Sequence, residues 1–229
     1  MRRPTILLSL ALLVIPFLAG GMQTAYCENP HEKWESEIKS FEEQDQLAAP
    51  EKQGVLFVGS SSIRMWDLAK SFPDKHYLNR GFGGSKIADT TYFADRIVLP
   101  YQPRTIVMYA GDNDIAGGKT PEQVLEDFQR FVQLAHGKLA ETRIVYIAIK
   151  PSIARWELVD KVRAANSLVR DYASGKKLLE FVDIDAPMIG DDGKPRADLF
   201  RDDGLHLSDK GYELWTALVA KAIDGQAAE

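Results

Sequence analysis

The segment Arg143-Ile-Val-Tyr-Ile-Ala-Ile149 decides the fold class, because it is a short run of almost wholly apolar, largely β-branched residues. A run of this kind is typical of a strand that is buried on both faces. Four weaker runs are also expected to be strands, and they are Gly54–Val58, His76–Asn79, Arg104–Tyr109 and Leu178–Val182. Helical patterns separate the runs, so we predict an α/β fold with a five-stranded parallel sheet covered by helices on both faces.

The clearest helical pattern begins at Thr120-Pro121-Glu122-Gln123, a capping box with proline in the first turn. Apolar residues also recur at helical spacing over 156–169 and 211–223, and an earlier helix is expected at about 30–47. The sequence contains neither an internal repeat nor a low-complexity linker. We therefore expect residues 27–229 to form a single domain.

The first 26 residues have a different character. Arg2 and Arg3 precede the apolar stretch Ile6–Ala19, which is too short to span a bilayer comfortably. This pattern is typical of a signal peptide, so we expect export to the periplasm or the medium and a mature chain without a stable membrane span. An uncleaved N-terminal membrane anchor is the alternative. Cys27 is the only cysteine, which excludes an internal disulfide.

The charge of the chain argues against one class of partner. The formal net charge is −5 and the pI is about 5.5. Nucleic-acid-binding domains usually carry a basic patch and a high pI. We therefore expect no nucleic-acid partner.

Polar segments follow the predicted strands, at the edge where open parallel sheets bind their ligands. They are Val58–Ser62, Asn79–Ser85, Gly111–Asp114 and, after the fifth strand, Asp202–Ser208. Taken singly, each has a structural explanation as a helix cap, a turn or a local hydrogen bond. Familiar binding motifs do not fit them. A calcium loop from Asp112 would need Glu at position 123, which is Gln, and no second His or Cys ligand suggests a metal.

Taken together, the four segments supply the parts of a serine hydrolase. Ser61 can act as nucleophile if a base removes its proton, and His206 is the only histidine in a loop at this edge. Asp203, three residues earlier, can orient the imidazole. The amides of Ser61 and Gly84, with the side chain of Asn113, can donate hydrogen bonds to an oxyanion.

Gly59-Ser60-Ser61, Gly84, the Gly-x-Asn-Asp of residues 111–114 and the Asp-x-x-His of residues 203–206 resemble the four blocks of the SGNH (GDSL-type) hydrolases. The resemblance covers residues 54–224 and implies a three-layer α/β/α, flavodoxin-like fold and hydrolysis of carboxylic esters without metal or cofactor. It assigns Ser61, Asp203 and His206 to the triad, and Gly84 and Asn113 to the oxyanion hole. Two departures, Ser60 for the usual Asp and Ser85 for an acidic residue, leave the substrate open.

The substrate is expected to be a small-molecule or glycan ester with a short acyl group, because no long apolar insertion lies beside the predicted site. Arg64, Arg80, Arg155 and Trp156 are candidates for the rim of the pocket. The alternative is that the arginines pair with acidic neighbours and that Trp156 belongs to the core. Three other functions also remain open: a polysaccharide deacylase, a lysophospholipid deacylase and a non-enzymatic sugar- or acyl-binding module.

Overall fold

The computed structural model describes residues 29–225, and the predicted signal peptide (residues 1–26) and Cys27 lie outside the described residues. Within this part of the chain, the strands form one all-parallel sheet in the order β2-β1-β3-β4-β5. The α/β class and the five-stranded parallel sheet are thus confirmed. The strands are β1 (Val55–Gly59), β2 (Leu78–Gly81), β3 (Thr105–Tyr109), β4 (Arg143–Ile147) and β5 (Leu179–Val182).

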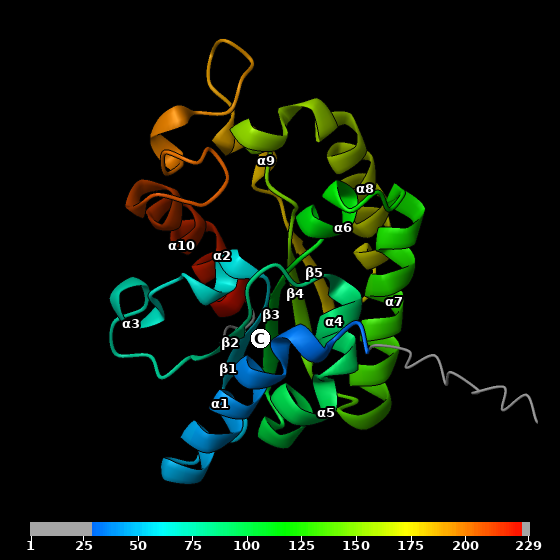
Figure 1. Cartoon of the computed structure of the whole chain (residues 1–229), viewed down its shortest axis with the longest axis vertical. Coiled ribbons are helices and arrows are strands. Elements are labelled where there is room, and N and C mark those ends of the chain that lie inside the picture. The colour runs from blue at the N-terminus through cyan, green and yellow to red at the C-terminus, as the bar shows by residue number, and fades with distance from the viewer. Residues whose placement is uncertain (1–28, 226–229) are drawn as a thin grey trace, which may run out of the picture. The chain divides into compact units, whose positions relative to one another are not determined.

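Helices cover both faces of the sheet and make three layers (Figure 1). One face is covered by α1 (Glu35–Leu47), α4 (Ile87–Tyr92), α5 (Ala94–Ile97), α7 (Pro121–Lys138) and α8 (Val159–Ala173). The other is covered by α2 (Ser61–Arg64), α3 (Leu68–Ser71), α9 (Asp185–Met188) and α10 (Asp209–Asp224). The remaining elements are α6 (Asp112–Ala116) and the 3-10 turns η1 (Glu32–Trp34), η2 (Leu99–Tyr101), η3 (Ile153–Leu158) and η4 (Ala197–Leu199).

The two layers follow from the alternation of side chains along each strand. Leu56 and Met108 point into the core beneath α1, α4, α7 and α8. Phe57 and Val107, their neighbours in sequence, point into the core beneath α10. Because both faces are covered, β1, β3 and β4 are buried along their whole length, and this explains why they are almost wholly apolar rather than alternating.

Several boundaries differ from expectation by one or two residues. The second strand begins at Leu78 rather than His76, because its register is set by pairing of Leu78 with Leu56 of β1. The fourth ends at Ile147 rather than Ile149. There the side chain of Asn166 in α8 bonds both the amide of Ile149 (2.8 Å) and its carbonyl (2.9 Å) and replaces the sheet ladder. The N-terminal helix opens with the 3-10 turn η1.

The strand order places a reversal between β1 and β3. From β1 the chain first adds β2 on one side, then returns to add β3, β4 and β5 on the other. In open α/β sheets, ligands bind beyond the carboxyl ends of the strands at this reversal. The segments that follow β1 and β3 are therefore the first places to look for a site.

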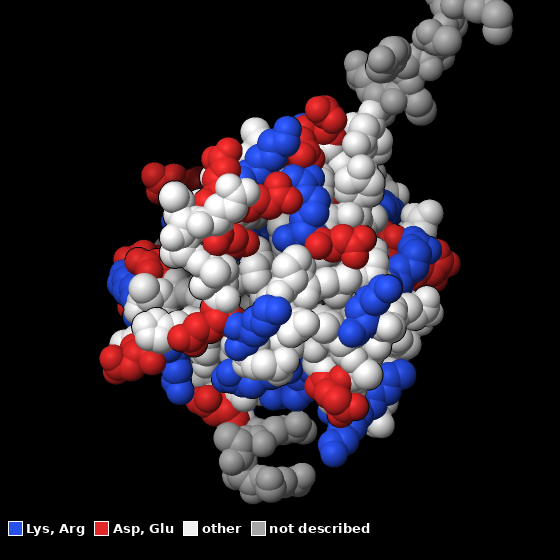
Figure 2. Space-filling view, turned by 90° about the horizontal axis from the view of Figure 1, so that it is seen from below, with Lys and Arg blue, Asp and Glu red and all other residues white. Residues whose placement is uncertain are grey.

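The charged side chains on one face of the molecule are mixed in sign. Figure 2 shows acidic and basic side chains interspersed there, without a broad basic area. Separately, no helix in the described range 29–225 has both the length and the apolar character needed to cross a membrane.

Candidate active site

The nucleophile candidate Ser61 is presented by a sharp turn at the end of β1. Gly59 has a φ of 130°, and a Cβ atom there would lie 1.9 Å from the carbonyl oxygen of Tyr109 in β3. Only glycine permits this approach of the two strands. The chain then enters α2, of which Ser61 is the first residue, and the Ser61 side chain is partly exposed at the carboxyl edge of the sheet.

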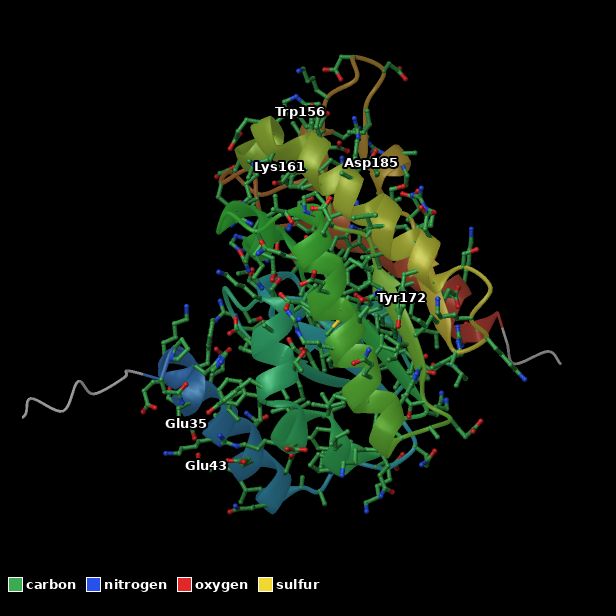
Figure 3. All side chains as sticks on the ribbon, turned by 90° about the vertical axis from the view of Figure 1, so that its right-hand side faces the viewer. Glu35, Glu43, Trp156, Lys161, Tyr172 and Asp185 are labelled. Carbon is green, nitrogen blue, oxygen red and sulfur yellow. The ribbon has the colours of Figure 1, made fainter. Side chains whose placement is uncertain are left out.

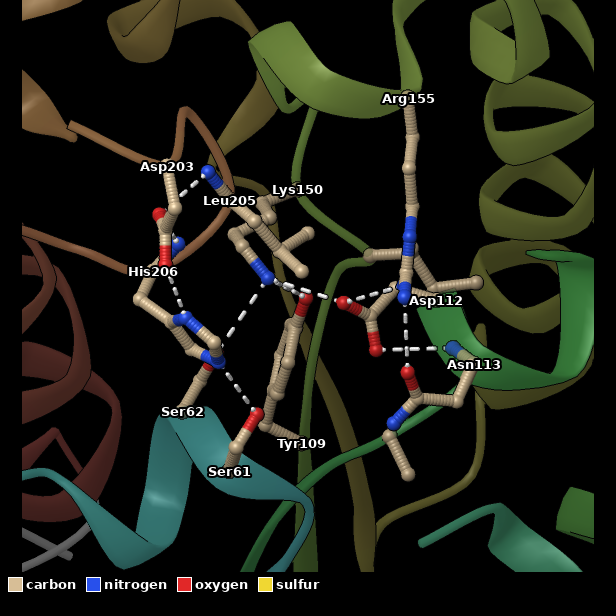
Figure 4. A network of polar contacts seen from close by, with 12 residues as sticks. Ser61, Ser62, Tyr109, Asp112, Asn113, Lys150, Arg155, Asp203, Leu205 and His206 are labelled. Carbon is tan, nitrogen blue, oxygen red and sulfur yellow. Dashed lines mark hydrogen bonds and ion pairs between the residues drawn. The ribbon is translucent and has the colours of Figure 1, made fainter. Parts of the chain in front are cut away.

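The structure brings Ser61, His206 and Asp203 into one chain of hydrogen bonds (Figure 4). The Nε2 atom of His206 lies 3.1 Å from the Oγ atom of Ser61. On the other side of the ring, Nδ1 lies 2.6 Å from Oδ2 of Asp203. The carboxylate favours the tautomer in which Nδ1 carries the proton and donates a hydrogen bond to Asp203. In that tautomer Nε2 is unprotonated and can accept the serine proton.

Asp203 is held by its own loop as well as by the imidazole. Its Oδ1 atom accepts hydrogen bonds from the backbone amides of Leu205 and His206, both at 2.9 Å. The hydrogen bond with the His206 side chain, followed by these two amide bonds, holds the pKa of Asp203 well below its usual range. The Asp203 carboxylate is therefore held in its ionised form.

The three oxyanion candidates lie on segments that hydrogen bonds join to one another. Ser61 is the first residue of α2, so its amide has no acceptor within the helix. Gly84 is exposed with a φ of 71°, and no atom lies within 4 Å of where its Cβ would be. The Nδ2 amide of Asn113 donates to the carbonyl of Ser85 at 3.0 Å, and the Ser85 hydroxyl donates to the carbonyl of Gly59 at 3.1 Å. These bonds fasten the segments after β1, β2 and β3 together.

Asp114, on the far side of Asn113, does not belong to this constellation. It is fully buried, pairs with Lys119 at 2.8 Å and accepts the amide of Ile87 at 3.3 Å. Burial raises the pKa of this carboxyl in spite of its cationic partner. Asp114 therefore ties α6 to α4, and its role is structural.

Arg80, one of the predicted rim arginines, lies away from the triad. Its side chain is only 5% exposed, where it pairs with Asp45 of α1. It also donates to the hydroxyl of Tyr101 at 2.8 Å. The expectation that Arg80 lines the mouth is wrong, because its position in β2 directs it into the layer beneath α1.

The other three rim candidates have different surroundings. Arg64 lies against Gly83, in the segment of residues 82–85 that carries Gly84 and is called the oxyanion loop below. It pairs with Glu37 at 3.6 Å. Trp156 is half-buried rather than in the core. The guanidinium of Arg163 and the ammonium of Lys194 lie 5.7 and 5.0 Å from its ring centre. Figure 3 shows Trp156 at the same end of the molecule as Lys161 and Asp185.

Arg155 lies directly behind the oxyanion candidate. Its Nη2 atom donates to Oδ1 of Asn113 at 3.1 Å, and Nη1 lies 3.1 Å from Oδ2 of Asp112. The same carboxylate oxygen accepts a hydrogen bond from Lys150 at 3.0 Å. These contacts make Arg155 a neighbour of the site, not an arginine of an exposed rim.

Asp112 and Lys150 were not among the predicted site residues. A signal was nevertheless present, since Lys150 continues the most apolar strand in the chain without a polar break. A lysine in that position must be buried at the carboxyl edge, where it needs an anionic partner. The structure shows the Lys150 side chain 1% exposed and paired with Asp112.

Three sizeable cavities of the described residues lie away from the triad. One, of about 700 Å³, is lined by residues of α8 and β5 and the turn between them. A second, of about 460 Å³, is at the amino ends of β1 and β2 and includes Val55, Leu78 and Tyr101 in its walls. A third, of about 520 Å³, is lined largely by residues of α3 and α10. None of the three is lined by Ser61, Asp203 or His206.

Comparison with known proteins places this geometry in a family. The GDSL-like Lipase/Acylhydrolase family matches residues 58–214, more than half of the chain. No curated protein matches it.

Solved structures share the fold at low sequence identity. A Streptococcus pneumonia protein described as a platelet activating factor is 22% identical, with a TM-score of 0.74 over 84% of this chain and 94% of that one. A GDSL-like lipase from Bacteroides thetaiotaomicron VPI-5482 is 22% identical, with a TM-score of 0.68 over 86% and 98%. A carbohydrate esterase family 3 protein from Talaromyces cellulolyticus is 15% identical, with a TM-score of 0.58 over 75% and 96%.

At these identities the structural likeness shows a common fold. The family match, over residues 58–214, contains all four sequence blocks. The chain belongs to the GDSL-like lipase/acylhydrolase family and is a hydrolase that acts on ester bonds.

Proposed function

We propose that the protein is a serine esterase that hydrolyses carboxylic esters of short acyl groups through an acyl-enzyme. The observation that carries the proposal is the continuous contact from Ser61 through His206 to Asp203, with distances of 3.1 and 2.6 Å. A serine hydroxyl becomes a nucleophile near neutral pH when a neutral imidazole accepts its proton. The contact has the direction that this transfer requires.

Ser61 Oγ would attack the ester carbonyl carbon while His206 Nε2 takes the hydroxyl proton. The carbonyl oxygen, now negative, would accept hydrogen bonds from the amides of Ser61 and Gly84 and from Asn113 Nδ2. The tetrahedral intermediate would expel the alcohol, which takes the proton from His206, and leave the acyl group on Ser61. Water, deprotonated by His206, would then attack the acyl carbonyl carbon, and the second tetrahedral intermediate would release the acid as Ser61 Oγ takes the proton back from His206.

The surface around the triad favours a short acyl group. Among the described residues, the exposed large apolar side chains are Leu47, Tyr92 and Ile153. Of these, Ile153 lies against Gly204 in the loop that carries Asp203 and His206 (residues 202–208, the catalytic loop). It is a single exposed apolar side chain there and not part of an apolar patch. A lipase that meets aggregated lipid would need a larger apolar surface.

A second candidate is removal of acyl groups from a polysaccharide. An open site, with Gly84 exposed and Asp203 48% exposed, leaves room for a long polar alcohol. The carbohydrate esterase family 3 protein from Talaromyces cellulolyticus shares the fold. A lysophospholipid deacylase and a non-enzymatic sugar- or acyl-binding module are less well supported, since the first needs apolar surface and the second has no use for a triad.

Export is part of the proposal and rests on residues 1–26 of the sequence alone. Periplasmic or secreted location would suit an esterase whose substrate is a glycan ester outside the cytoplasm. Intact-mass measurement of the native protein checks this directly. A mature chain that starts near Met22 to Glu28 supports export with cleavage, and retention of residues 1–20 favours the membrane-anchor alternative.

The acyl-enzyme is tested by mixing a known concentration of enzyme with an excess of p-nitrophenyl acetate and following nitrophenol at short times. We expect a burst of about one equivalent, and an acetyl group on the Ser61 peptide after acid quenching. Ser61→Ala should lack both, whereas Ser40→Ala, a change on the exposed surface of α1, should retain both. Turnover by Ser61→Ala at the wild-type rate would contradict the proposed function.

A further inference from the structure

We propose that Arg155 and Asp112, anchored by Lys150, are positioning residues that set the direction of the Asn113 amide in the oxyanion hole. The inference rests on the proposed function, because it concerns the same site. It starts from a chain of contacts that no step of the mechanism above uses (Figure 4).

An asparagine side chain can face an oxyanion with either end, and only the Nδ2 end donates. Two contacts decide in which directions the Oδ1 and Nδ2 ends of Asn113 point. A guanidinium carries donors only, so Arg155 Nη2 can bond Asn113 only through Oδ1, at 3.1 Å. The carbonyl of Ser85 is an acceptor, so it engages Nδ2, at 3.0 Å. These two bonds leave the second hydrogen of Nδ2 for another acceptor, in the hole beside Ser61.

Arg155 is held in turn by a buried carboxylate. Asp112 has a side chain that is 8% exposed, and its Oδ2 atom lies between Arg155 Nη1 (3.1 Å) and Lys150 Nζ (3.0 Å). Burial raises the pKa of Asp112, but the two cations outweigh it and leave the pKa lowered. The other oxygen, Oδ1, accepts the backbone amide of Asn113 at 2.9 Å. Asp112 thus holds both the main chain of Asn113 and the partner of its side chain.

Lys150 connects this unit to the ends of three strands. Its ammonium donates to the hydroxyl of Tyr109, the last residue of β3, at 2.9 Å, and to Ser62 Oγ in α2 at 3.3 Å. Tyr212 of α10 in turn donates to the Ser62 carbonyl at 2.9 Å. Lys150 itself follows β4, so the network joins the segments after β1, β3 and β4 on both sides of the topological reversal.

The charges of the network also have the sign that an oxyanion needs. Arg155 and Lys150 carry two positive charges and Asp112 one negative charge, which leaves one positive charge beside Asn113. Asp112 and Lys150 are buried, and groups whose positions are set before reaction stabilise a developing negative charge. A network of this kind supplies both the charge and the preorganisation.

The test is a double-mutant cycle between Arg155 and Asn113. Arg155→Met keeps the unbranched stem of the side chain without its guanidinium, and it changes a residue that is 22% exposed. Asp112→Asn would strand buried Lys150 and can prevent folding, so it is not the primary variant. Arg155→Met, Asn113→Ala and the double variant are compared with Arg170→Met, which removes an exposed ion pair with Asp183. Thermal unfolding identifies any variant that fails to fold.

We expect Arg155→Met to lower kcat about tenfold or more with KM changed less than twofold, since removal of a whole oxyanion donor costs about 10²–10³ in kcat. The double variant should be no slower than Asn113→Ala alone, because a positioning residue has nothing left to position. Arg155→Lys should recover part of the loss, since an ammonium can reach Asn113 or Asp112 but not bridge both. Arg170→Met should match wild type. The rate of Ser61 phosphonylation by a fluorophosphonate should show the same pattern.

Two results would overturn the inference while wild type still hydrolyses esters. One is full additivity of the Arg155 and Asn113 effects. The other is a rise in KM with kcat unchanged, which would make Arg155 a substrate contact. If wild type shows neither ester hydrolysis nor Ser61 phosphonylation, the proposed function fails and the inference fails with it.

Discussion

The Nε2 atom of His206 lies 3.1 Å from the Oγ atom of Ser61, although 145 residues separate them in the chain. The contact is not what holds the two segments together. The catalytic loop is fastened by a hydrogen bond from the Ala154 amide to the Gly204 carbonyl (3.0 Å), and α2 by the bond from Tyr212 to Ser62 (2.9 Å). Substitutions within the triad should therefore change catalysis without unfolding the domain.

The pH dependence of activity follows from which triad member is protonated first. The hydrogen bond with His206 and the two amide bonds lower the pKa of Asp203, so its carboxylate stays ionised as the pH falls. A protonated His206 cannot accept the serine proton, so activity requires the neutral imidazole. We expect log kcat/KM to fall with a slope of one on the acid side. A slope of two, or activity unchanged down to pH 4, would exclude this assignment of the base.

Asn113→Ala should lower kcat by about 10²–10³ with little change in KM, because its amide acts mainly on charge that develops in the transition state. Steady-state kinetics with p-nitrophenyl acetate measure both parameters. The neighbouring Asp114→Asn serves as a contrast, since that carboxylate contacts Lys119 and Ile87 rather than the site. It should lower stability more than kcat. An effect of Asn113→Ala confined to KM would make Asn113 a substrate-binding group.

Trp34 lies outside the residues that the family model matches, yet it contacts the oxyanion loop. We expect Trp34→Phe to destabilise this loop. The indole Nε1–H of Trp34 donates to the carbonyl of Gly83 at 2.8 Å, and its ring packs edge-on against Phe82 at 5.7 Å. Loss of the hydrogen bond should cost about 1–3 kcal/mol in the free energy of unfolding. Because Gly83 precedes Gly84, kcat should also fall several-fold.

Urea unfolding and steady-state kinetics check the two effects of Trp34→Phe. Lys33→Met is the matched control, since it removes the cation above the indole ring and leaves the hydrogen bond in place. Wild-type kcat in Trp34→Phe would show that η1 stabilises the fold without supporting the site.

The acyl-chain profile tests the short-acyl proposal. We expect hydrolysis to be fastest with acetyl to butyryl p-nitrophenyl esters and negligible beyond about eight carbons. A site with Ile153 as its main apolar contact offers little of the ~0.8 kcal/mol that each further buried CH₂ can contribute. An acetylated glycan assayed beside them distinguishes a polysaccharide deacylase. A profile that peaks at long chains would place the protein with lipases or lysophospholipases instead.

Several features of the fold were predictable because they depend on local chemistry. The apolar run at Arg143 and the capping box at Thr120 identified β4 and α7, since burial on both faces and a satisfied helix terminus leave clear marks in the sequence. The weakly apolar second strand was misplaced by two residues. Its register is set by hydrogen bonds to β1, which no pattern within His76–Asn79 contains.

The sequence by itself determined the strand-helix alternation and the positions of Ser61, Gly84 and Asn113 after the ends of strands, whereas Asp203 and His206 lie further on, in the loop before α10. It could do so because residues that follow parallel strands share one edge of the sheet. What only the tertiary structure decided is where the arginines point. Arg80 faces α1 and pairs with Asp45, whereas Arg155 donates a hydrogen bond to Asn113 and forms an ion pair with Asp112. A long charged side chain pairs with the acceptor that tertiary packing places within its reach. Contacts between segments distant in the chain determine which acceptor that is.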